Sequence, residues 1–308
     1  MRVSVMFMLL ITMFATSGFT SEINLSGDVR VRHEVVDDST ATNHTTRQRL
    51  RARLNATTQV SDSTSVGIGL ASGGANARST NQTLGGTFTS KGIMLDTAYI
   101  KTKVKGLDVL AGKFKNPLTT LSELNWDSDI RPEGVAIGTG YKRFSLKGAY
   151  FVIDDNAVDD PSLVVGQLGY QGKKFVLTSS YTTMQKVAGD NSYVNVNTAF
   201  SVWKLRAFGE YNVNLDTGTD DTAWIAGLGA DLGKLNVKYT YRHVEANGVS
   251  ALLTDSDFGQ GTDTKGSEIN ASYKLDDVKF GVTYFILQNG VTNGTHYDRL
   301  MVDASVKF

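Results

Sequence analysis

The chain of 308 residues contains no cysteine and only three prolines. Without cysteine it can form neither a disulfide, nor a thiolate metal site, nor a lipid-modified N-terminal cysteine. Lysine and arginine together number 31, as do aspartate and glutamate, so the formal net charge is zero. A balanced charge gives no reason to expect nucleic acid or an anionic membrane surface as a partner.

Long hydrophobic runs are also scarce. One run, residues 5–15, follows Arg2 and is followed by small residues near 17–21. It is too short to span a bilayer as a helix, so we expect residues 1–21 to be a secretory signal peptide cleaved near 17–21; a retained anchor helix is the alternative. No later run reaches 18 apolar residues. This leaves an exported soluble β-protein, or a membrane barrel over residues 22–308 whose alternation conceals its lipid face.

What the chain does contain is alternation of apolar and polar residues with period two. In the first segment, Val29 and Val31 alternate with Asp28, Arg30 and Arg32, which is typical of a strand with two different faces. Two segments, 92–104 and 107–115, break phase, and a β-bulge there would restore it. Sixteen such segments can be counted, at 22–36, 46–60, 64–74, 92–104, 107–115, 134–141, 144–153, 163–171, 174–186, 193–202, 203–214, 222–231, 234–246, 267–275, 277–288 and 296–308.

The connections between these segments alternate strictly between short turns and longer loops. An antiparallel membrane barrel has this order, with short periplasmic turns on one rim and long extracellular loops on the other. Proline cannot donate to a closed strand ladder, and Pro117, Pro132 and Pro161 all fall in predicted loops. The eight predicted loops are 37–45, 75–91, 116–133, 154–162, 187–192, 215–221, 247–266 and 289–295.

The last segment alternates up to a terminal aromatic residue, Phe308. Such an ending resembles the export and insertion signal of Gram-negative outer-membrane barrels. In its signal peptide, strand order and closing motif Val302–Phe308, essentially the whole mature chain resembles Gram-negative porins of the putative porin type. The segments Leu25–Arg32, Leu95–Ile100 and Ala111–Pro117 also look like early strands of that family. The resemblance implies an all-β, sixteen-stranded, antiparallel up-and-down barrel in the cell outer membrane. It also implies contact with the lipid bilayer and assembly as a homotrimer. We expect the acidic external loops to contact lipopolysaccharide by bridging divalent cations to its phosphates.

If the apolar parity faces lipid, the polar parity lines the lumen. The densest polar segment, Thr46–Asn55, carries four alternate arginines, which stand about 7 Å apart on one strand face. Facing lipid near the midplane, each would cost about 2–4 kcal/mol, so we expect them to face water. The alternative to a functional basic wall is a solvated wall held by pairing with Asp28 and Glu34. The predicted pore-lining basic ladder is Arg30, Arg32, Arg47, Arg49, Arg51 and Arg53.

The third long loop, 116–133, is the candidate for the side opposite the ladder. Resemblance to general porins implies that it folds into the barrel and narrows it. It is acidic, and Trp126 and Ile130 could pack against the wall. An ordinary surface loop is the alternative, since loops 75–91 and 247–266 are as long. The predicted constriction-loop residues are Glu123, Asp127, Asp129, Arg131 and Glu133.

These features predict a water-filled channel for passive diffusion of ions and small hydrophilic solutes, filtered by charge and size. We expect no enzyme, because the four histidines have no evident nucleophile partner or metal-ligand spacing. Asp255, Asp257 and Gly259 match part of a calcium loop only, so a solvated external loop is favoured there. No metal, cofactor or nucleic acid is predicted. The alternatives are a substrate-specific anion or phosphate channel and an outer-membrane barrel enzyme.

Overall fold

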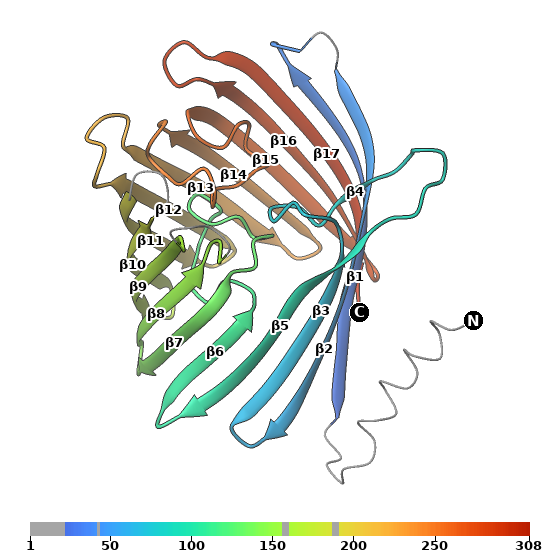
Figure 1. The fold of residues 1–308 in the computed structure, drawn as a ribbon. Helices are drawn as coiled ribbons and strands as arrows, with labels where there is room; N and C mark the ends of the chain where they lie inside the picture. The colour runs from blue at the N-terminus through green and yellow to red at the C-terminus, as the bar shows by residue number, and fades with distance from the viewer. Residues whose placement is uncertain (1–21, 42–43, 156–159, 187–190) are drawn as a thin grey trace.

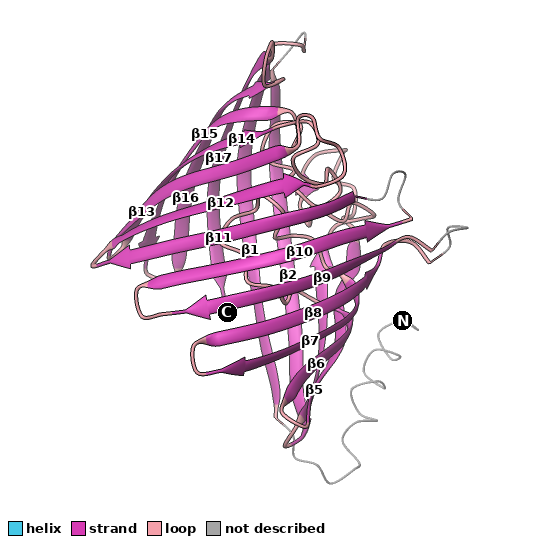
Figure 2. Cartoon of the chain, turned by 90° about the vertical axis from the view of Figure 1, so that its left-hand side faces the viewer, coloured by secondary structure: helices cyan, strands magenta, loops and turns pink. Residues whose placement is uncertain are grey.

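The computed structural model describes residues 22–41, 44–155, 160–186 and 191–308, which form one antiparallel sheet closed into a barrel (Figures 1 and 2). The predicted signal peptide, residues 1–21, lies outside the described residues. No helix in the described part of the chain is long and apolar enough to cross a membrane. The strands are β1 (Ile23–Asp38), β2 (Thr45–Ser61), β3 (Thr64–Ser72), β4 (Gln82–Thr83), β5 (Ile93–Val104), β6 (Leu107–Lys113), β7 (Glu133–Tyr141), β8 (Phe144–Val152), β9 (Ser162–Gln171), β10 (Phe175–Gln185), β11 (Asn191–Val202), β12 (Leu205–Asn214), β13 (Thr222–Leu232), β14 (Leu235–Val244), β15 (Thr264–Leu275), β16 (Val278–Asn289) and β17 (Thr295–Lys307).

The barrel closes where the first strand meets the last. β1 pairs with β17 on one side and with β2 on the other, and Gly27 and Phe308 exchange two backbone hydrogen bonds of 2.8 and 3.1 Å. Closure gives each of the sixteen long strands in the described chain a hydrogen-bonded neighbour on both sides. The predicted sixteen-stranded antiparallel barrel is confirmed. The short strand β4 was not predicted; it lies within the loop expected at 75–91 and pairs with Arg49 and Leu50 of β2.

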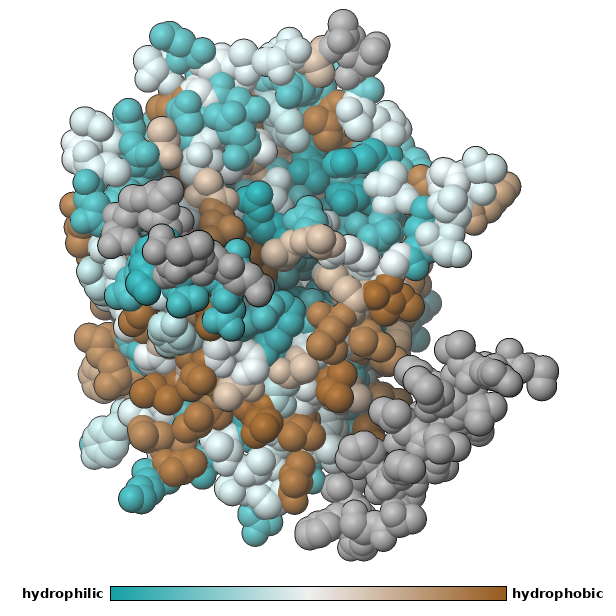
Figure 3. All heavy atoms as spheres, viewed as in Figure 1, coloured by the Kyte–Doolittle hydropathy of each residue, from teal (hydrophilic) through white to brown (hydrophobic). Residues whose placement is uncertain are grey.

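The wall of the barrel is apolar outside and charged inside. On β1, Val29 and Val31 are 43% and 48% exposed, whereas Asp28, Arg32 and Glu34 are 6%, 6% and 0% exposed. Figure 3 shows hydrophobic residues gathered over the lower wall and hydrophilic residues around the upper rim. A soluble sandwich would bury its apolar parity instead. The exterior is therefore suited to lipid and the interior to water.

The connections follow the predicted alternation. Short turns of two or three residues alternate with longer loops, and all three prolines lie outside the strands. The expected bulge lies on β5, where the register with β3 shifts between Gly69 and Leu70. As a result, the consecutive residues Asp96 and Thr97 are both buried. The bulge thus turns Asp96 into the lumen, where it can meet a basic partner.

A close backbone approach on β7 generates a test of the fold. Gly134 has φ +150°, and a Cβ there would lie 2.1 Å from the carbonyl oxygen of Tyr150. We expect Gly134→Ala to lower the free energy of unfolding by about 1–3 kcal/mol, measured by urea titration in detergent micelles. Gly138→Ala on the same strand is the control, because its nearest neighbour would be 3.6 Å away. Equal urea midpoints for the two variants would contradict the register assigned here.

Candidate functional site

The third loop, residues 114–132 between β6 and β7, turns into the barrel and packs on its wall (Figure 1). Phe114 and Trp126 lie edge-on to Phe151 of β8, with ring centroids 6.1 and 5.7 Å apart. Leu124 is fully buried in a separate apolar cluster, which includes Ile225 and Phe285 of the opposite wall. Apolar contacts on two sides thus hold the loop across the lumen.

The seventh long loop, residues 245–263 between β14 and β15, also enters the barrel and is hydrogen-bonded to the third loop. The Asp127 amide donates to the Leu253 carbonyl (2.7 Å), and the Thr254 hydroxyl donates to the Leu124 carbonyl (2.7 Å). The expectation of a solvated external loop around Asp255 is wrong, because that side chain is only 5% exposed. A sequence signal was available in Phe258, an aromatic residue in a polar loop, which is buried beneath the Arg242 guanidinium.

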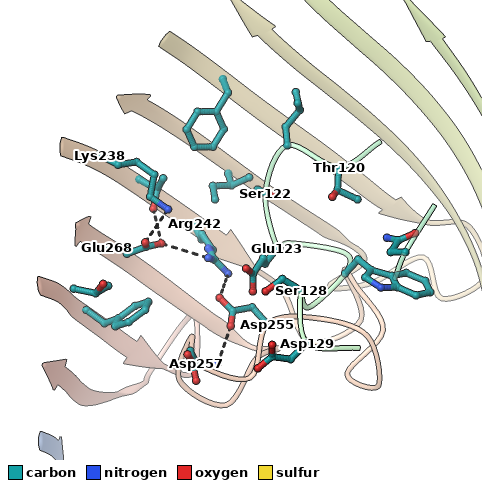
Figure 4. Close-up of a pocket in the computed structure, with 18 of the residues that line it drawn as sticks. Thr120, Ser122, Glu123, Ser128, Asp129, Lys238, Arg242, Asp255, Asp257 and Glu268 are labelled. Carbon is teal, nitrogen blue, oxygen red and sulfur yellow. Dashed lines mark hydrogen bonds and ion pairs between the residues drawn. The ribbon is translucent and has the colours of Figure 1, made fainter. Parts of the chain in front are cut away.

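Between these loops and the wall lies a cavity of about 680 Å³ whose lining is dense in charge (Figure 4). Strands β2, β12, β14 and β15 and both loops contribute charged groups to it. The cavity is therefore a polar, solvent-accessible space inside an apolar shell. Its basic residues are Arg51, Arg53, Lys115, Arg131, Arg206, Lys238 and Arg242, and its acidic residues are Glu123, Asp129, Asp255, Asp257 and Glu268.

Two residues of the predicted ladder reach this cavity. Arg51 and Arg53 of β2 both donate to Asp28 of β1, at 2.7 and 2.6 Å. Arg53 also lies 3.7 Å from Asp129 of the third loop. A predicted ladder residue and a predicted loop residue therefore meet in an ion pair across the edge of the cavity.

Higher on the same wall, the remaining ladder arginines on β2 surround a fully buried carboxylate. Arg47 and Arg49 both donate to Glu34, and Arg299 of β17 lies 3.3 Å from it. A buried charge needs such partners, because its desolvation would otherwise cost several kcal/mol. Neither Arg47 nor Arg49 is among the residues that line the cavity.

The two ladder arginines on β1 differ from each other in their partners. Arg32 donates to Asp303 at 2.7 Å and lies 3.6 Å from Asp257 of the seventh loop. Arg30 donates to the side-chain carbonyl of Asn81 at 2.6 Å. Neither lines the cavity, so these residues support the wall and loops around it.

The opposite wall carries a chain of ion pairs that the sequence analysis did not single out. Lys238 lies 2.8 Å from Glu268, and Arg242 lies 2.8 Å from Asp255 and 3.5 Å from Glu268 (Figure 4). Period-two alternation places the three strand residues inward, but the Asp255 contact depends on the entry of the seventh loop. Local sequence patterns could not have predicted it.

The five predicted constriction-loop residues separate into different environments. Glu123 and Asp129 line the cavity. Asp127 is not among the residues that line the cavity and accepts a hydrogen bond from the Ser256 hydroxyl at 3.1 Å. Arg131 also lines the cavity and donates to Asp96 at 3.1 Å. Glu133 is the first residue of β7, pairs with Lys113 at 2.6 Å, and is not among the cavity residues.

Three carboxylates meet at the junction of the two loops: Glu123, Asp127 and Asp255, each offering an oxygen within 4.8 Å of the others. Burial, reinforced by Asp255 and Asp127, raises the pKa of Glu123 to about 8. Burial also raises the pKa of Asp127 to about 6, although the backbone hydrogen bonds that this carboxylate accepts lower the pKa. This spacing could hold a metal ion, but Arg242 already supplies a positive charge beside Asp255, and we assign no metal.

Leu124 generates a test of how the third loop is held. Truncating a fully buried leucine costs about 2–5 kcal/mol, so we expect Leu124→Ala to loosen the third loop and raise single-channel conductance in planar bilayers. Leu121→Ala is the control, because Leu121 lines the open cavity and lies outside that buried cluster. Equal conductance in the two variants and the unchanged protein would refute this anchoring role.

Glu123 generates a test of pH dependence. Its pKa of about 8 means that the carboxyl is neutral at pH 7 and gains a negative charge by pH 9. We therefore expect the reversal potential under a salt gradient to shift towards cation selectivity over this interval. Glu123→Gln should remove most of the shift. A shift of the same size in that variant would assign the pH dependence to another group.

Comparison with known proteins agrees with this geometry. The family described as putative porin matches residues 21–156, and no curated protein matches the chain in sequence. A solved variant of the Rh. blastica porin is 16% identical, with a TM-score of 0.62 over 93% of this chain and 100% of that one. Salmonella typhi OmpF in complex with daunomycin is 11% identical, with a TM-score of 0.66 over 94% of this chain and 98% of that one.

At these identities the solved structures establish a shared fold, while the family match covers the N-terminal part of the chain. The resemblance drawn from the sequence is confirmed: residues 21–156 match the putative porin family, and the described chain folds as a porin barrel.

Proposed function

We propose that this protein is an outer-membrane channel through which ions and small hydrophilic solutes diffuse passively. The observation that carries the proposal is a closed barrel with an apolar exterior and a cavity of about 680 Å³ lined by charged residues inside. An apolar outer face matches the hydrocarbon of a bilayer, and a charged inner face requires water. The putative porin match and the porin fold support the same activity.

We further propose that the lumen filters by size and charge. The third loop would set the size limit, because it crosses the barrel interior together with the seventh. The basic wall of the lumen and the acidic groups of the third loop would act on charge. Rings and patches of charged side chains determine ion preference in pores by this means.

The location and assembly of the protein are part of the proposal. The barrel would lie in the cell outer membrane, in contact with lipid and lipopolysaccharide, after a signal peptide at 1–21 has directed export. Assembly as a homotrimer is inferred from the resemblance to porins. We propose no nucleic-acid partner and no cofactor.

A substrate-specific anion or phosphate channel is the second candidate, favoured by the seven basic residues against five acidic ones that line the cavity. Block of the conductance by micromolar phosphate would favour it over a general channel. A barrel enzyme gains no support from the site, since none of the described residues lining the cavity is a histidine. Serine residues alone do not make an activated nucleophile.

The charge filter is tested by replacing Arg49 and Arg51 with serine. The double variant loses two positive charges and leaves Glu34 and Asp28 with fewer partners. We expect its reversal potential in a planar bilayer under a KCl gradient to shift towards cation selectivity. Lys142→Ser with Arg143→Ser removes the same charge from an exposed turn and serves as the control.

Two outcomes would count against these proposals in different ways. An unchanged reversal potential in the Arg49 and Arg51 variant would refute the charge filter. The absence of discrete ion-conducting steps in the unchanged protein would refute the channel itself.

A further inference from the structure

Most of the basic groups in the cavity are neutralised by close carboxylates. Two opposite charges side by side form a dipole, and the field of a dipole falls off faster than that of a single charge. These residues therefore contribute little to the net field felt by an ion in the open part of the lumen. The paired groups are Arg51 and Arg53 with Asp28 (2.7 and 2.6 Å), Arg53 also with Asp129 (3.7 Å), Arg131 with Asp96 (3.1 Å), Lys238 with Glu268 (2.8 Å) and Arg242 with Asp255 (2.8 Å), so five carboxylates balance five cations.

Lys115 and Arg206 are the exceptions among the cavity's basic residues. Both are exposed to the cavity, and neither lies in an ion pair within the described parts of the chain. Partial desolvation lowers the pKa of Lys115, in the third loop, and the positive charges of Arg131 and Arg53 lower it further. The carboxylates Asp96 and Asp28 act in the opposite direction with a smaller effect, and each is itself paired with an arginine. Arg206, on β12, lies 5.9 Å from the centre of the Phe208 ring.

The acidic residues do not offset these two charges at neutral pH. Asp129, Asp255, Asp257 and Glu268 each lie within ion-pair distance of an arginine or lysine. Glu123 is the one lining carboxyl without such a pair among the described residues, and its pKa of about 8 keeps it protonated at pH 7. The unpaired charge of the cavity is therefore positive.

We propose that Lys115 and Arg206 are the residues that determine ion selectivity, and that they make the lumen prefer small anions such as chloride. This inference rests on the proposed channel function and refines its charge filter. Within that filter, the arginine ladder and its carboxylates hold the wall and the two loops in place. The two unpaired cations attract the anion from solution, because no carboxylate of the described residues lies within ion-pair distance of them to cancel their field.

The experiment measures the chloride-to-potassium permeability ratio from the reversal potential of the full-length protein in planar bilayers under a KCl gradient at pH 7. Lys115→Gln and Arg206→Gln should each lower the ratio by roughly two- to threefold. Lys115→Arg retains the charge and should retain the ratio. Lys142→Gln, which removes a charge from an exposed turn, should leave it unchanged.

A pair deletion separates this inference from a selectivity set by the ladder. Asp28→Asn with Arg51→Gln removes one acid and one base, so the ratio should stay as in the unchanged protein. If the chloride-to-potassium permeability ratio fell in this double variant as far as it does in Lys115→Gln, the inference would be overturned. An unchanged permeability ratio in both Lys115→Gln and Arg206→Gln, in a protein that conducts, would also overturn it. Absence of conductance in the unchanged protein would instead overturn the proposed function.

Discussion

The closed hydrogen-bonded ladder between β1 and β17 is the constraint on which the rest of the structure depends. Once every strand has two neighbours, the backbone polar groups of the sheet are satisfied without water. The outer face can then be apolar, as at Val29 and Val31. Because side chains alternate along a strand, the same closure forces the intervening charged residues into the interior.

Charges gathered inside the barrel must in turn be paired. Glu34 is fully buried and meets three arginines, and Asp28 meets two. Removing one partner from such a group leaves an uncompensated charge, which costs more than the pair itself contributes. The arginines of β2 therefore support the wall, as in the alternative of a solvated wall held by pairing with Asp28 and Glu34, and their action on a solute remains a proposal.

The sequence predicted the strands well because their determinants are local. Alternation and turn residues placed every barrel strand within three residues of its bounds; the largest difference is β15, which begins at Thr264 and not at 267. The bulge at Asp96 followed from a break in the same alternation. A two-residue strand such as β4 is too short to produce a periodic signal.

The site was harder to predict because it is built from contacts between distant residues. The acidic character of the third loop was evident, but its pairing with the seventh loop, such as Asp127 with Leu253, depends on which loops fold inward. Alternation likewise indicates that a residue faces the lumen without saying whether a carboxylate lies beside it. That distinction separates Arg51, which is paired, from Lys115, which has no ion pair among the residues that the structure describes.

The central claim is that this apolar-walled barrel encloses a conducting, positively biased lumen. Its most direct test is a recording of single channels from the purified protein in a planar bilayer under a KCl gradient at pH 7. The account predicts discrete conductance steps with a reversal potential displaced from zero towards the equilibrium potential of chloride. A protein that inserts into the bilayer but gives no conductance steps would contradict it. So would a reversal potential displaced towards the equilibrium potential of potassium.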